Sequence, residues 1–392
     1  MAELTVDALV VGGGPAGLAA AIVLARAGVP TLLCEKKRFP VDKACGEGLL
    51  PTGVVHLRAL GAAPYLDAYF PFRGITYYAS GGRGAAADFA EGPGWGIRRT
   101  TLSRALLQQA ETLSCLQIVA GTTAEPLRRE GDRIFVRVGH DVVRTRLLVG
   151  ADGLNSRVRR WAGLDGRRPR WQRWGARQHF QLRPWGDHVE VYWSGRGVEA
   201  YVTPCGDACV GVAFLWDRRR FRQLRGGAGL FPSLLACFPF LQARLNGAPP
   251  LDAVAAMGPL QRRVPTPVAG GVLLIGDAAG YLDAITGEGL SLALAQALSL
   301  EETVVPHLQA GAGAIRTAHL DAYRRRHRAL FRPYCRFTSL VLLLNRYPSL
   351  ADRVVGALAA DPALFRHLLS ANMGLASPWS PSIWWRLLWG LR

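Results

Sequence analysis

Residues 5–17 read Thr-Val-Asp-Ala-Leu-Val-Val-Gly-Gly-Gly-Pro-Ala-Gly, an apolar run that ends in a cluster of glycines. The stretch 5–11 is rich in β-branched and apolar residues, which predicts a strand buried on both faces. The Ala- and Leu-rich stretch 18–27 predicts a helix that stops at Gly28. Residues 31–35, Thr-Leu-Leu-Cys-Glu, predict a second strand. This order of strand, glycine turn, helix and strand indicates a doubly wound α/β fold.

The glycines have the spacing G-x-G-x-x-G, in the position where nucleotide-binding folds carry it. Gly12 allows a tight turn, Gly14 lets the backbone approach a pyrophosphate, and Gly17 lets the helix pack closely on the strand. Pro15 and Ala16 complete the turn at the start of the helix. The free N–H groups and the positive dipole of a helix N-terminus favour phosphate there, so we expect all five residues to contact a nucleotide.

An acidic residue completes the predicted nucleotide site. Glu35 lies 18 residues beyond Gly17 and is expected to end the second strand. A carboxylate in this place accepts hydrogen bonds from the ribose hydroxyls of adenosine. We count its neighbour Lys36 with the cofactor-binding residues. The motif by itself does not distinguish NAD from FAD.

Two later segments extend the pattern. Residues 147–153, Leu-Leu-Val-Gly-Ala-Asp-Gly, predict a strand and a tight turn before a helix. Residues 272–280, Val-Leu-Leu-Ile-Gly-Asp-Ala-Ala-Gly, predict a strand and a loop, and another helix is expected to start near Gly287. Each turn carries one acid, Asp152 in the first and Asp277 in the second.

The three segments, in this order and spacing, resemble the p-hydroxybenzoate hydroxylase-like flavoprotein superfamily, which includes aromatic hydroxylases, flavin halogenases and geranylgeranyl reductases. The resemblance covers about residues 5–305 and implies bound FAD. It implies that Asp277 hydrogen-bonds a ribityl hydroxyl and that Asp152 fixes the turn beside the pyrophosphate. It also implies that the helix near Gly287 directs N–H groups at the pyrimidine edge of the flavin, where negative charge collects on reduction. The cofactor-binding residues of the last segment are then Gly276, Asp277, Gly287, Gly289 and Leu290. The alternative is that both acids only cap helices.

Two arginines precede a predicted helix at residues 101–113. In the family an arginine just before this helix contacts the ribityl and phosphate region, so Arg98 and Arg99 are alternative cofactor ligands, and a surface arginine is the other interpretation of each. The sequence contains no second complete G-x-G-x-x-G. We therefore expect no separate NADPH domain and propose NAD(P)H as a transient electron donor, with another redox protein as the alternative.

The segment 39–51 carries Lys-x-Cys-Gly-x-Gly, which resembles a signature of geranylgeranyl reductases. The resemblance implies that this loop runs alongside the isoalloxazine ring, and small residues such as Gly46 allow backbone to approach a flat ring. Cys45 is then a candidate for positioning substrate or supplying a proton, as well as a cofactor contact. A small packing residue is the alternative for Cys45.

The middle region, about 170–260, alternates in short β-like runs and predicts an antiparallel sheet beneath a substrate. Geranylgeranyl reductases have a Tyr-x-Trp pair before a Phe-Pro, where this chain has Glu199 and Tyr201 before Thr203 and Pro204. The reductase signature is thus broken, and Ala284 also stands where family members often have proline. We expect Glu199 and Tyr201, with Tyr192, to place polar groups over the flavin, and we take the first two as catalytic candidates.

We therefore predict an α/β protein with a Rossmann-like FAD-binding domain, an inserted antiparallel β-sheet substrate domain and a helical C-terminal region. The predicted boundaries are 1–165 with 258–310 for the discontinuous FAD-binding domain, 166–257 with part of 70–100 for the substrate domain, and 311–392 for the helical region. No stretch reaches the ~18 uninterrupted apolar residues that a spanning helix needs, and the N-terminus has no signal peptide.

The charge is strongly positive, with a formal net charge of +18 over 392 residues. Only three of the 47 basic residues are lysines, a bias typical of a GC-rich genome, and no nucleic-acid motif is present. We expect no specific nucleic-acid partner. The seven cysteines show no pairing pattern and no metal-ligand spacing, which predicts a reducing cytoplasm and no metal site.

The C-terminal tail, 378–392, combines tryptophan and arginine. Trp379, Trp384, Trp385 and Trp389, with Arg386 and Arg392, suit a membrane interface. We therefore expect a cytoplasmic protein with a peripheral contact at the inner face of the membrane. A helix packed on the core or on a dimer partner is the equal alternative, and the sequence does not determine the oligomeric state.

These observations favour an FAD-dependent oxidoreductase acting on a hydrophobic small molecule. The leading hypothesis is a monooxygenase that uses NAD(P)H and O2 to hydroxylate an aromatic, polyketide or lipid-like compound in a water-shielded site. The alternative is a geranylgeranyl reductase-like enzyme that reduces carbon–carbon double bonds. A flavin-binding scaffold without activity is a third class, against which the intact flavin motifs argue.

Overall fold

The computed structural model describes residues 3–166, 173–219 and 229–377, and single residues from 381 to 386. Its first layer is an eight-stranded sheet in which the central strands are parallel. In spatial order the main path is β17 (Val268–Ala269), β18 (Val272–Leu274), β11 (Asp141–Gly150), β1 (Glu3–Val11), β2 (Thr31–Glu35) and β8 (Leu116–Ala120). An antiparallel extension from β11 adds β10 (Arg133–Val138) and β9 (Ala124–Glu130).

Helices cover this sheet because its central strands are apolar on both faces. One face is packed by α1 (Pro15–Arg26), with α3 (Arg99–Glu111) and α7 (Gly289–Leu298) on either side of it. The fully buried Leu18 and Ile22 of α1 join Val10 of β1 in one hydrophobic cluster. The short helix α4 (Arg157–Trp161) contacts β11 and β9. The carboxyl ends of the parallel strands therefore open onto a single edge, where nucleotides bind in such folds.

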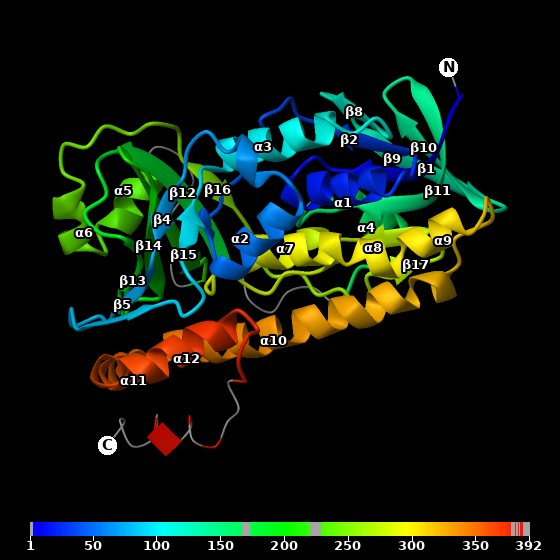
Figure 1. The fold of residues 1–392 in the computed structure, drawn as a ribbon. Coiled ribbons are helices and arrows are strands. Elements are labelled where there is room, and N and C mark those ends of the chain that lie inside the picture. Colours follow the sequence, from blue (N-terminus) through cyan, green and yellow to red (C-terminus); the bar gives the residue numbers. More distant parts are fainter. Residues whose placement is uncertain are drawn as a thin grey trace.

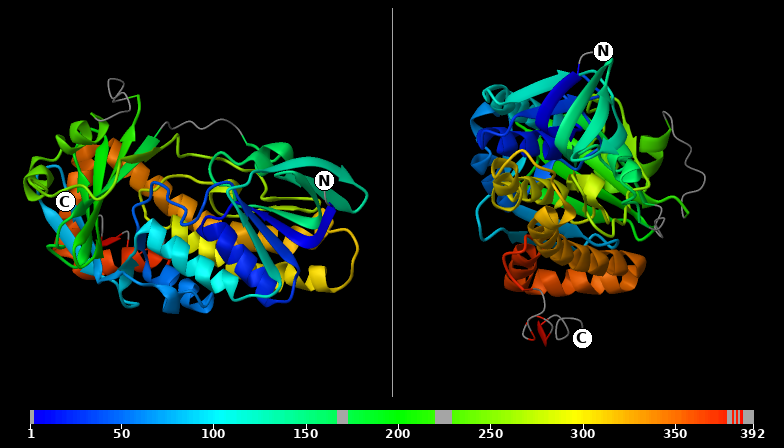
Figure 2. Two further views of the ribbon diagram at one scale, coloured as in Figure 1. Left: turned by 90° about the horizontal axis from the view of Figure 1, so that it is seen from above. Right: turned by 90° about the vertical axis from the view of Figure 1, so that its right-hand side faces the viewer.

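The second layer is a seven-stranded, mainly antiparallel sheet at the opposite end of the molecule (Figures 1 and 2). Its spatial order is β16 (Ala255–Met257), β12 (Arg173–Gln181), β15 (Cys209–Asp217), β14 (Val198–Gly206), β13 (His188–Trp193), β5 (Gly74–Tyr78) and β6 (Gly84–Asp88). The strands β5 and β6 enter it from the first third of the chain. A small third sheet has the spatial order β3 (Gly48–Leu49), β7 (Gly94–Gly96) and β4 (Phe70–Phe72), and β5 and β6 lie between β4 and β7 in the chain.

Alternate residues of the antiparallel sheet face opposite sides, as strand geometry requires. Even-numbered residues such as Ala200, Val202 and Val212 join the hydrophobic cluster with α5 (Leu230–Leu235) and α6 (Pro239–Arg244). Odd-numbered residues such as Val191 and Tyr201 face the other way, toward the interior of the protein. This parity decides which side chains reach the candidate site.

The C-terminal part is helical. A 26-residue helix, α10 (Asp321–Arg346), runs along one side of the molecule from the parallel sheet to the antiparallel sheet (Figure 1). It is followed by α11 (Pro348–Ala360) and α12 (Pro362–Asn372), which pack against β6. The remaining helices are α2 (Pro51–Ala59), η1 (Ala63–Tyr65), η2 (Gly276–Ala279), α8 (Leu300–Thr303), α9 (Val305–Gln309) and η3 (Thr317–Leu320).

The fold agrees with the predicted class: a Rossmann-like parallel sheet, a separate antiparallel sheet and a helical C-terminus. No helix among the described residues is both long and apolar enough to span a bilayer. Of the tail residues expected at a membrane, Trp379, Trp384, Trp389 and Arg392 lie outside the described residues. Trp385 is 64% exposed, and Arg386 pairs with Asp361 at 2.5 Å.

Candidate active site

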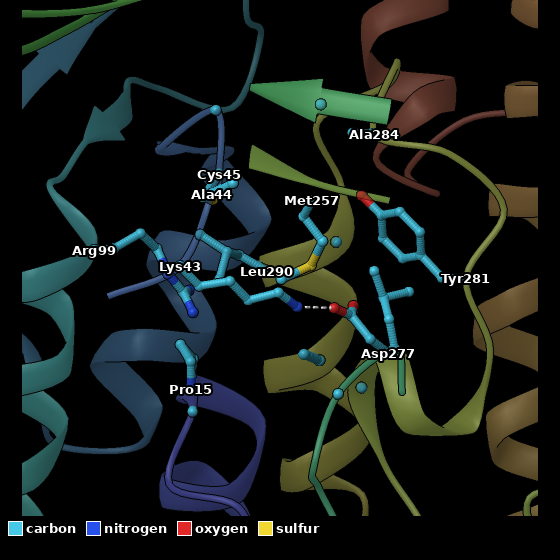
Figure 3. A pocket seen from close by; sticks show the side chains of 18 of the residues that line it. Pro15, Lys43, Ala44, Cys45, Arg99, Met257, Asp277, Tyr281, Ala284 and Leu290 are labelled. Atoms are coloured by element: carbon cyan, nitrogen blue, oxygen red, sulfur yellow. Dashed lines mark hydrogen bonds and ion pairs between the residues drawn. The ribbon is translucent and has the colours of Figure 1, made fainter. Parts of the chain in front are cut away.

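A cavity of about 480 Å³ runs from the carboxyl ends of the parallel strands to the inner face of the antiparallel sheet. Its nucleotide end is lined by Gly12 after β1, Glu35 at the end of β2, Asp152 after β11 and Asp277 after β18. Pro15, Ala16, Lys36, Cys45 and Gly46 also line it. Figure 3 shows Pro15 at the start of α1 below Lys43, with Arg99 and Asp277 on opposite sides of the cavity.

Two glycines of the turn, Gly12 and Gly17, pack tightly against other protein atoms, whereas Gly14 does not. A Cβ on Gly17 would lie 1.8 Å from the carbonyl oxygen of Gly12, and a Cβ on Gly12 would lie 2.4 Å from that of Ala151. A Cβ on Gly14 would meet nothing within 4 Å. Gly14 and not Gly17 lines the cavity, so Gly17 holds the turn together and Gly14 leaves open space at the helix N-terminus.

Glu35 holds this turn in place. One carboxylate oxygen accepts a hydrogen bond from the N–H of Gly13 at 2.5 Å, and the other accepts one from the N–H of Lys37 at 2.9 Å. The side chain is 6% exposed. The carboxylate is therefore fixed at the end of β2, where it can still accept hydrogen bonds from a ribose.

The two arginines offered by the sequence lie in different places. Arg98 pairs with Asp252 at 3.2 Å and does not line the cavity. Arg99 lines the cavity, is 6% exposed, and its Nε is buried without a hydrogen-bond partner. Within the described part of the chain, no carboxylate lies within ion-pair distance of the Arg99 guanidinium. A buried unpaired cation is costly, so Arg99 is the arginine placed to meet an anionic or polar ligand.

Asp152 and Asp277 differ in what they already bind. One oxygen of Asp152 accepts hydrogen bonds from the N–H groups of Arg157 and Val158 at the start of α4, whereas its other oxygen is buried and unpartnered. Asp152 thus caps a helix, as the plainer interpretation held, and also presents a free oxygen. Asp277 lies 2.5 Å from Lys43 Nζ (Figure 3).

The start of α7 forms the next part of the wall. Gly287, with φ of +71°, and Gly289 and Leu290 line the cavity. Gly276 has φ of +61°, and its turn places Asp277 at the end of β18. Glu288 is the N-cap of α7, and one of its carboxylate oxygens is buried without a partner. Burial raises the pKa of Glu288 to about 8, so this helix start is kept free of full negative charge near neutral pH.

A buried charged cluster holds the Lys-x-Cys-Gly-x-Gly loop against the antiparallel sheet. Glu47, with φ of +61° and 2% exposure, accepts a hydrogen bond from the N–H of Arg99 at 2.8 Å and contacts His179 Nε2. The other ring nitrogen of His179 lies 2.6 Å from Asp252. Arg177 bonds Asp252 at 2.7 Å. These contacts hold the loop that contains Cys45 against β12.

The cluster combines three carboxylates with two guanidiniums and the imidazole of His179. The carboxylates are Asp42, Glu47 and Asp252, and the guanidiniums are Arg98 and Arg177. Both ring nitrogens of His179 lie close to carboxylates, and Nδ1 also lies 3.1 Å from Nη1 of Arg177. Glu47, His179 and Cys205 also have the spacing of metal ligands. Arg177 lies 3.9 Å from Glu47, so positive charge is already supplied, and we assign this trio to hydrogen bonding.

Cys45 lies on the cavity side of this loop. Its thiol accepts from the N–H of Glu47 at 3.4 Å. Burial raises the pKa of Cys45, although Arg99 acts in the opposite direction. The thiol is therefore held protonated at neutral pH beside the cavity.

The other half of the cavity is apolar. Its wall is formed by strand and loop residues, and the strand residues of the antiparallel sheet among them are odd-numbered: Phe72, Ile75, Val189, Val191, Ala213, Leu215, Met257, Leu260, Ala284 and Ile285. The polar side chains there include Tyr77, Tyr201 and Thr203. A long hydrocarbon or an aromatic group fits such a surface.

Tyr201 and Glu199 share a strand face but not a position in the cavity. Tyr201 lines the cavity, whereas Glu199 is 0% exposed and does not line it. Its carboxylate is bound by Arg173 at 2.9 Å and 3.0 Å and by Asn345 of α10. The expectation that Glu199 itself lies over the flavin is thus not met. Tyr192 lies on the opposite face and donates to Glu190 at 2.6 Å, because its residue number has the other parity.

Sequence reasoning missed the partners that position these groups: Lys43, Glu47, Arg173, Arg177, His179, Asp252 and Asp283. A signal was present in part, because residues 173, 177 and 179 place charge on one face of a strand expected to line a substrate site. The partners from loops, Asp252 and Asp283, have no periodic pattern that could have indicated them.

The residues present fit a bound FAD. A helix N-terminus with open space at Gly14, a buried unpaired Arg99 guanidinium and a buried free oxygen on Asp152 all face one cavity. These groups match the needs of pyrophosphate and sugar hydroxyls.

Comparisons with known proteins agree with the site. The FAD binding domain family matches residues 5–207, and the chain belongs to this family. A menaquinone reductase from Mycobacterium tuberculosis is 29% identical over 308 residues, covering 74% of each chain. A digeranylgeranylglycerophospholipid reductase from Methanosarcina acetivorans is 26% identical over 307 residues, covering 72% of this chain and 71% of the relative. The crystal structure of a flavoprotein/dehydrogenase from Cytophaga hutchinsonii has a TM-score of 0.81 at 20% identity, covering 94% and 93% of the two chains. The protein is an FAD-dependent oxidoreductase.

Proposed function

We propose that this oxidoreductase reduces carbon–carbon double bonds in an isoprenoid lipid. The single observation that carries the proposal is the apolar half of the cavity, which continues directly from the flavin-binding half. A chain without polar groups gains free energy by burial there, at about 25 cal/mol per Å² of apolar surface. Long isoprenoid tails present that kind of surface.

The curated relatives support the same chemistry. Both reductases named above match about three quarters of this chain, and the name of one states a geranylgeranyl-bearing lipid. The sequence alone favoured hydroxylation over reduction. The names of the two relatives, both reductases, favour the reverse order.

The chain's own residues have distinct tasks in this proposal. Gly14, Arg99 and Asp152 hold the pyrophosphate and ribityl region, and the start of α7 stabilises negative charge at the pyrimidine edge. When bound, FAD supplies the two-electron chemistry, with NAD(P)H docking transiently as the donor of electrons or a redox protein in its place. Cys45 and the apolar wall orient the double bond and exclude water.

Hydroxylation of an aromatic ring is the second candidate. The observation that favours it is a pair of tyrosines, Tyr77 and Tyr201, within the otherwise apolar lining. Two phenolic hydroxyls suit a phenolic substrate better than a hydrocarbon chain. We also propose that the Trp- and Arg-containing tail brings the cavity to the inner face of a membrane, where both substrate classes would partition.

Product analysis tests the proposal. The purified holoenzyme is reduced with dithionite without oxygen and mixed with a geranylgeranyl phospholipid in detergent. We expect mass spectrometry to show the gain of two hydrogen atoms for each bond reduced. The control is Ala213→Trp, which places a large side chain on the wall of the apolar half. It should retain FAD and lose the reaction, whereas an unchanged lipid with wild-type enzyme would contradict the proposal.

A further inference from the structure

A second buried charge cluster adjoins the cavity at Tyr201. Arg173 bonds both oxygens of Glu199, and its Nε donates to Asp283 at 2.9 Å. The three side chains are 5%, 0% and 2% exposed. Among the residues that the structure describes, Arg173 is the one cation paired with either carboxylate.

Two carboxylates and one guanidinium would leave a net negative charge sealed from water. Burying an uncompensated charge costs several kcal/mol. Binding one proton removes this cost, and the two carboxyl groups then titrate as a coupled pair. Burial accordingly raises the pKa of Glu199 and that of Asp283, with Arg173 opposing the rise in both cases. The cluster is neutral when it holds one proton.

Tyr201 connects this cluster to the cavity. Its hydroxyl lies 3.1 Å from Glu199 Oε2 and 3.2 Å from the carbonyl oxygen of Ile285, while its side chain lines the cavity. Ile285 stands just before the Gly287 turn that leads into α7. The hydroxyl therefore lies between the flavin-binding loop and the proton-holding pair.

We propose that Tyr201 is the proton donor to the substrate and that the Glu199–Asp283 pair stores the proton which replaces it. This inference rests on the proposed reduction of a double bond. In the balanced step, one alkene carbon receives hydride carrying both electrons of the reduced cofactor. The other carbon receives the Tyr201 hydroxyl proton, the phenolic oxygen takes the stored carboxyl proton, and solvent restores that proton between turnovers. Tyr201 is thus a catalytic residue, and Glu199 a positioning residue that acts through it.

The groups that face Glu199 come from each element packed around it. They are Arg173 on β12, Tyr201 on β14, Tyr77 on β5, Asp283 in the loop before α7, and Asn345 on α10. Glu199 replaces the tyrosine of the reductase pattern, so the cluster distinguishes this chain from proteins that keep that pattern.

Infrared spectroscopy tests the stored proton without any turnover. The measurement uses a Glu288→Gln background, because Glu288, with its pKa of about 8, would contribute its own protonated carboxyl. At neutral pH we expect a carbonyl band of a buried protonated carboxyl that shifts in D2O. The band should vanish when Glu199→Gln and Asp283→Asn are added together. A spectrum without this band before those changes would overturn the inference.

Anaerobic single turnover tests the donor. Tyr201→Phe should retain FAD and its reduction by dithionite, yet slow reoxidation by the lipid about 100-fold or more, the usual contribution of a general acid. Glu199→Gln should slow it less and flatten its pH profile. Tyr192→Phe, on the other face of the sheet, is the matched control and should keep the wild-type rate. If Tyr201→Phe also keeps that rate, the inference fails alone. If the wild type does not reduce the lipid, the proposed function fails, and the infrared band still decides whether the proton is stored.

Discussion

Lys43 Nζ lies 2.5 Å from Asp277 Oδ2, although the two residues are 234 positions apart in the chain. The contact joins the loop of the Lys-x-Cys-Gly-x-Gly segment to the turn after β18 across the cavity (Figure 3). Both side chains are about a quarter exposed, at 27% and 23%. A polar ligand in the cavity can therefore compete for either partner.

Replacing Asp277 is expected to weaken FAD binding. In Asp277→Ala the dissociation constant should rise about tenfold, since one hydrogen bond from a hydroxyl to a charged group contributes roughly 1.5 kcal/mol or more. Fluorescence titration of the deflavinated protein measures it. Asp187→Asn, which breaks the exposed pair with Arg73, is the control and should leave the constant unchanged. Equal affinity of Asp277→Ala and wild type would remove Asp277 from the cofactor site.

Two glycine substitutions separate folding from cofactor binding. Gly14→Ala places its Cβ in open space, so the apoprotein should keep its melting temperature while FAD affinity falls. Gly17→Ala would drive its Cβ into the Gly12 carbonyl and should destabilise the apoprotein itself. Calorimetry with and without FAD checks both. A Gly14→Ala variant that binds FAD normally would show that phosphate does not approach this glycine.

The arginine pair gives a second contrast. Arg99→Met removes a buried cation that has no carboxylate partner in the described chain, so apoprotein stability should hold or rise while FAD binding weakens about 10- to 100-fold. Arg98→Met breaks the pair with Asp252 and should reduce stability more than FAD affinity. Chemical denaturation and fluorescence titration distinguish them. The reverse pattern would assign the cofactor contact to Arg98.

His327 on α10 predicts a pH dependence of stability. Burial lowers its pKa to about 4 from 6.5, and its Nε2 is buried without a partner. Between these values the unfolded state binds more protons than the folded state, so stability falls as pH falls from about 6.5 toward 4. Each pKa unit corresponds to about 1.4 kcal/mol.

His327→Leu should lose part of this acid sensitivity, which urea denaturation at pH 7.5 and pH 5 measures. The exposed His140→Gln is the matched control and should follow the wild type at both values. If His327→Leu weakens with acid as steeply as the wild type, His327 is not the group responsible.

The fold could be predicted from the sequence, and so could the meeting of Gly12, Gly14 and Glu35 at one end of the cavity, because those features are local. Gly12, Gly14 and Glu35 act through a turn and two adjacent strands, and the parallel strands are continuous apolar runs. The second half was harder to predict because its groups meet through tertiary packing. The spacing of Glu199 and Tyr201 predicts that both side chains lie on the same face of one strand. Glu199 nevertheless does not line the cavity, because it pairs with Arg173, which also binds Asp283.

The alternation of side chains along each strand explains why Tyr192 and Tyr201 lie on opposite faces of the sheet. Tyr192 was grouped with Tyr201 from its neighbourhood in the sequence, but β13 pairs Val191 with Tyr201 and Tyr192 with Ala200. Register between strands, which a single sequence does not state, thus decides which tyrosine faces substrate.

The most direct test of the central claim follows the flavin spectrum in a single mixing experiment. Reduced holoenzyme is mixed without oxygen with an isoprenoid lipid that carries double bonds, and in parallel with its fully saturated counterpart. We predict that the flavin reoxidises only with the unsaturated lipid. A flavin that stays reduced with both lipids until oxygen enters would contradict the reductase.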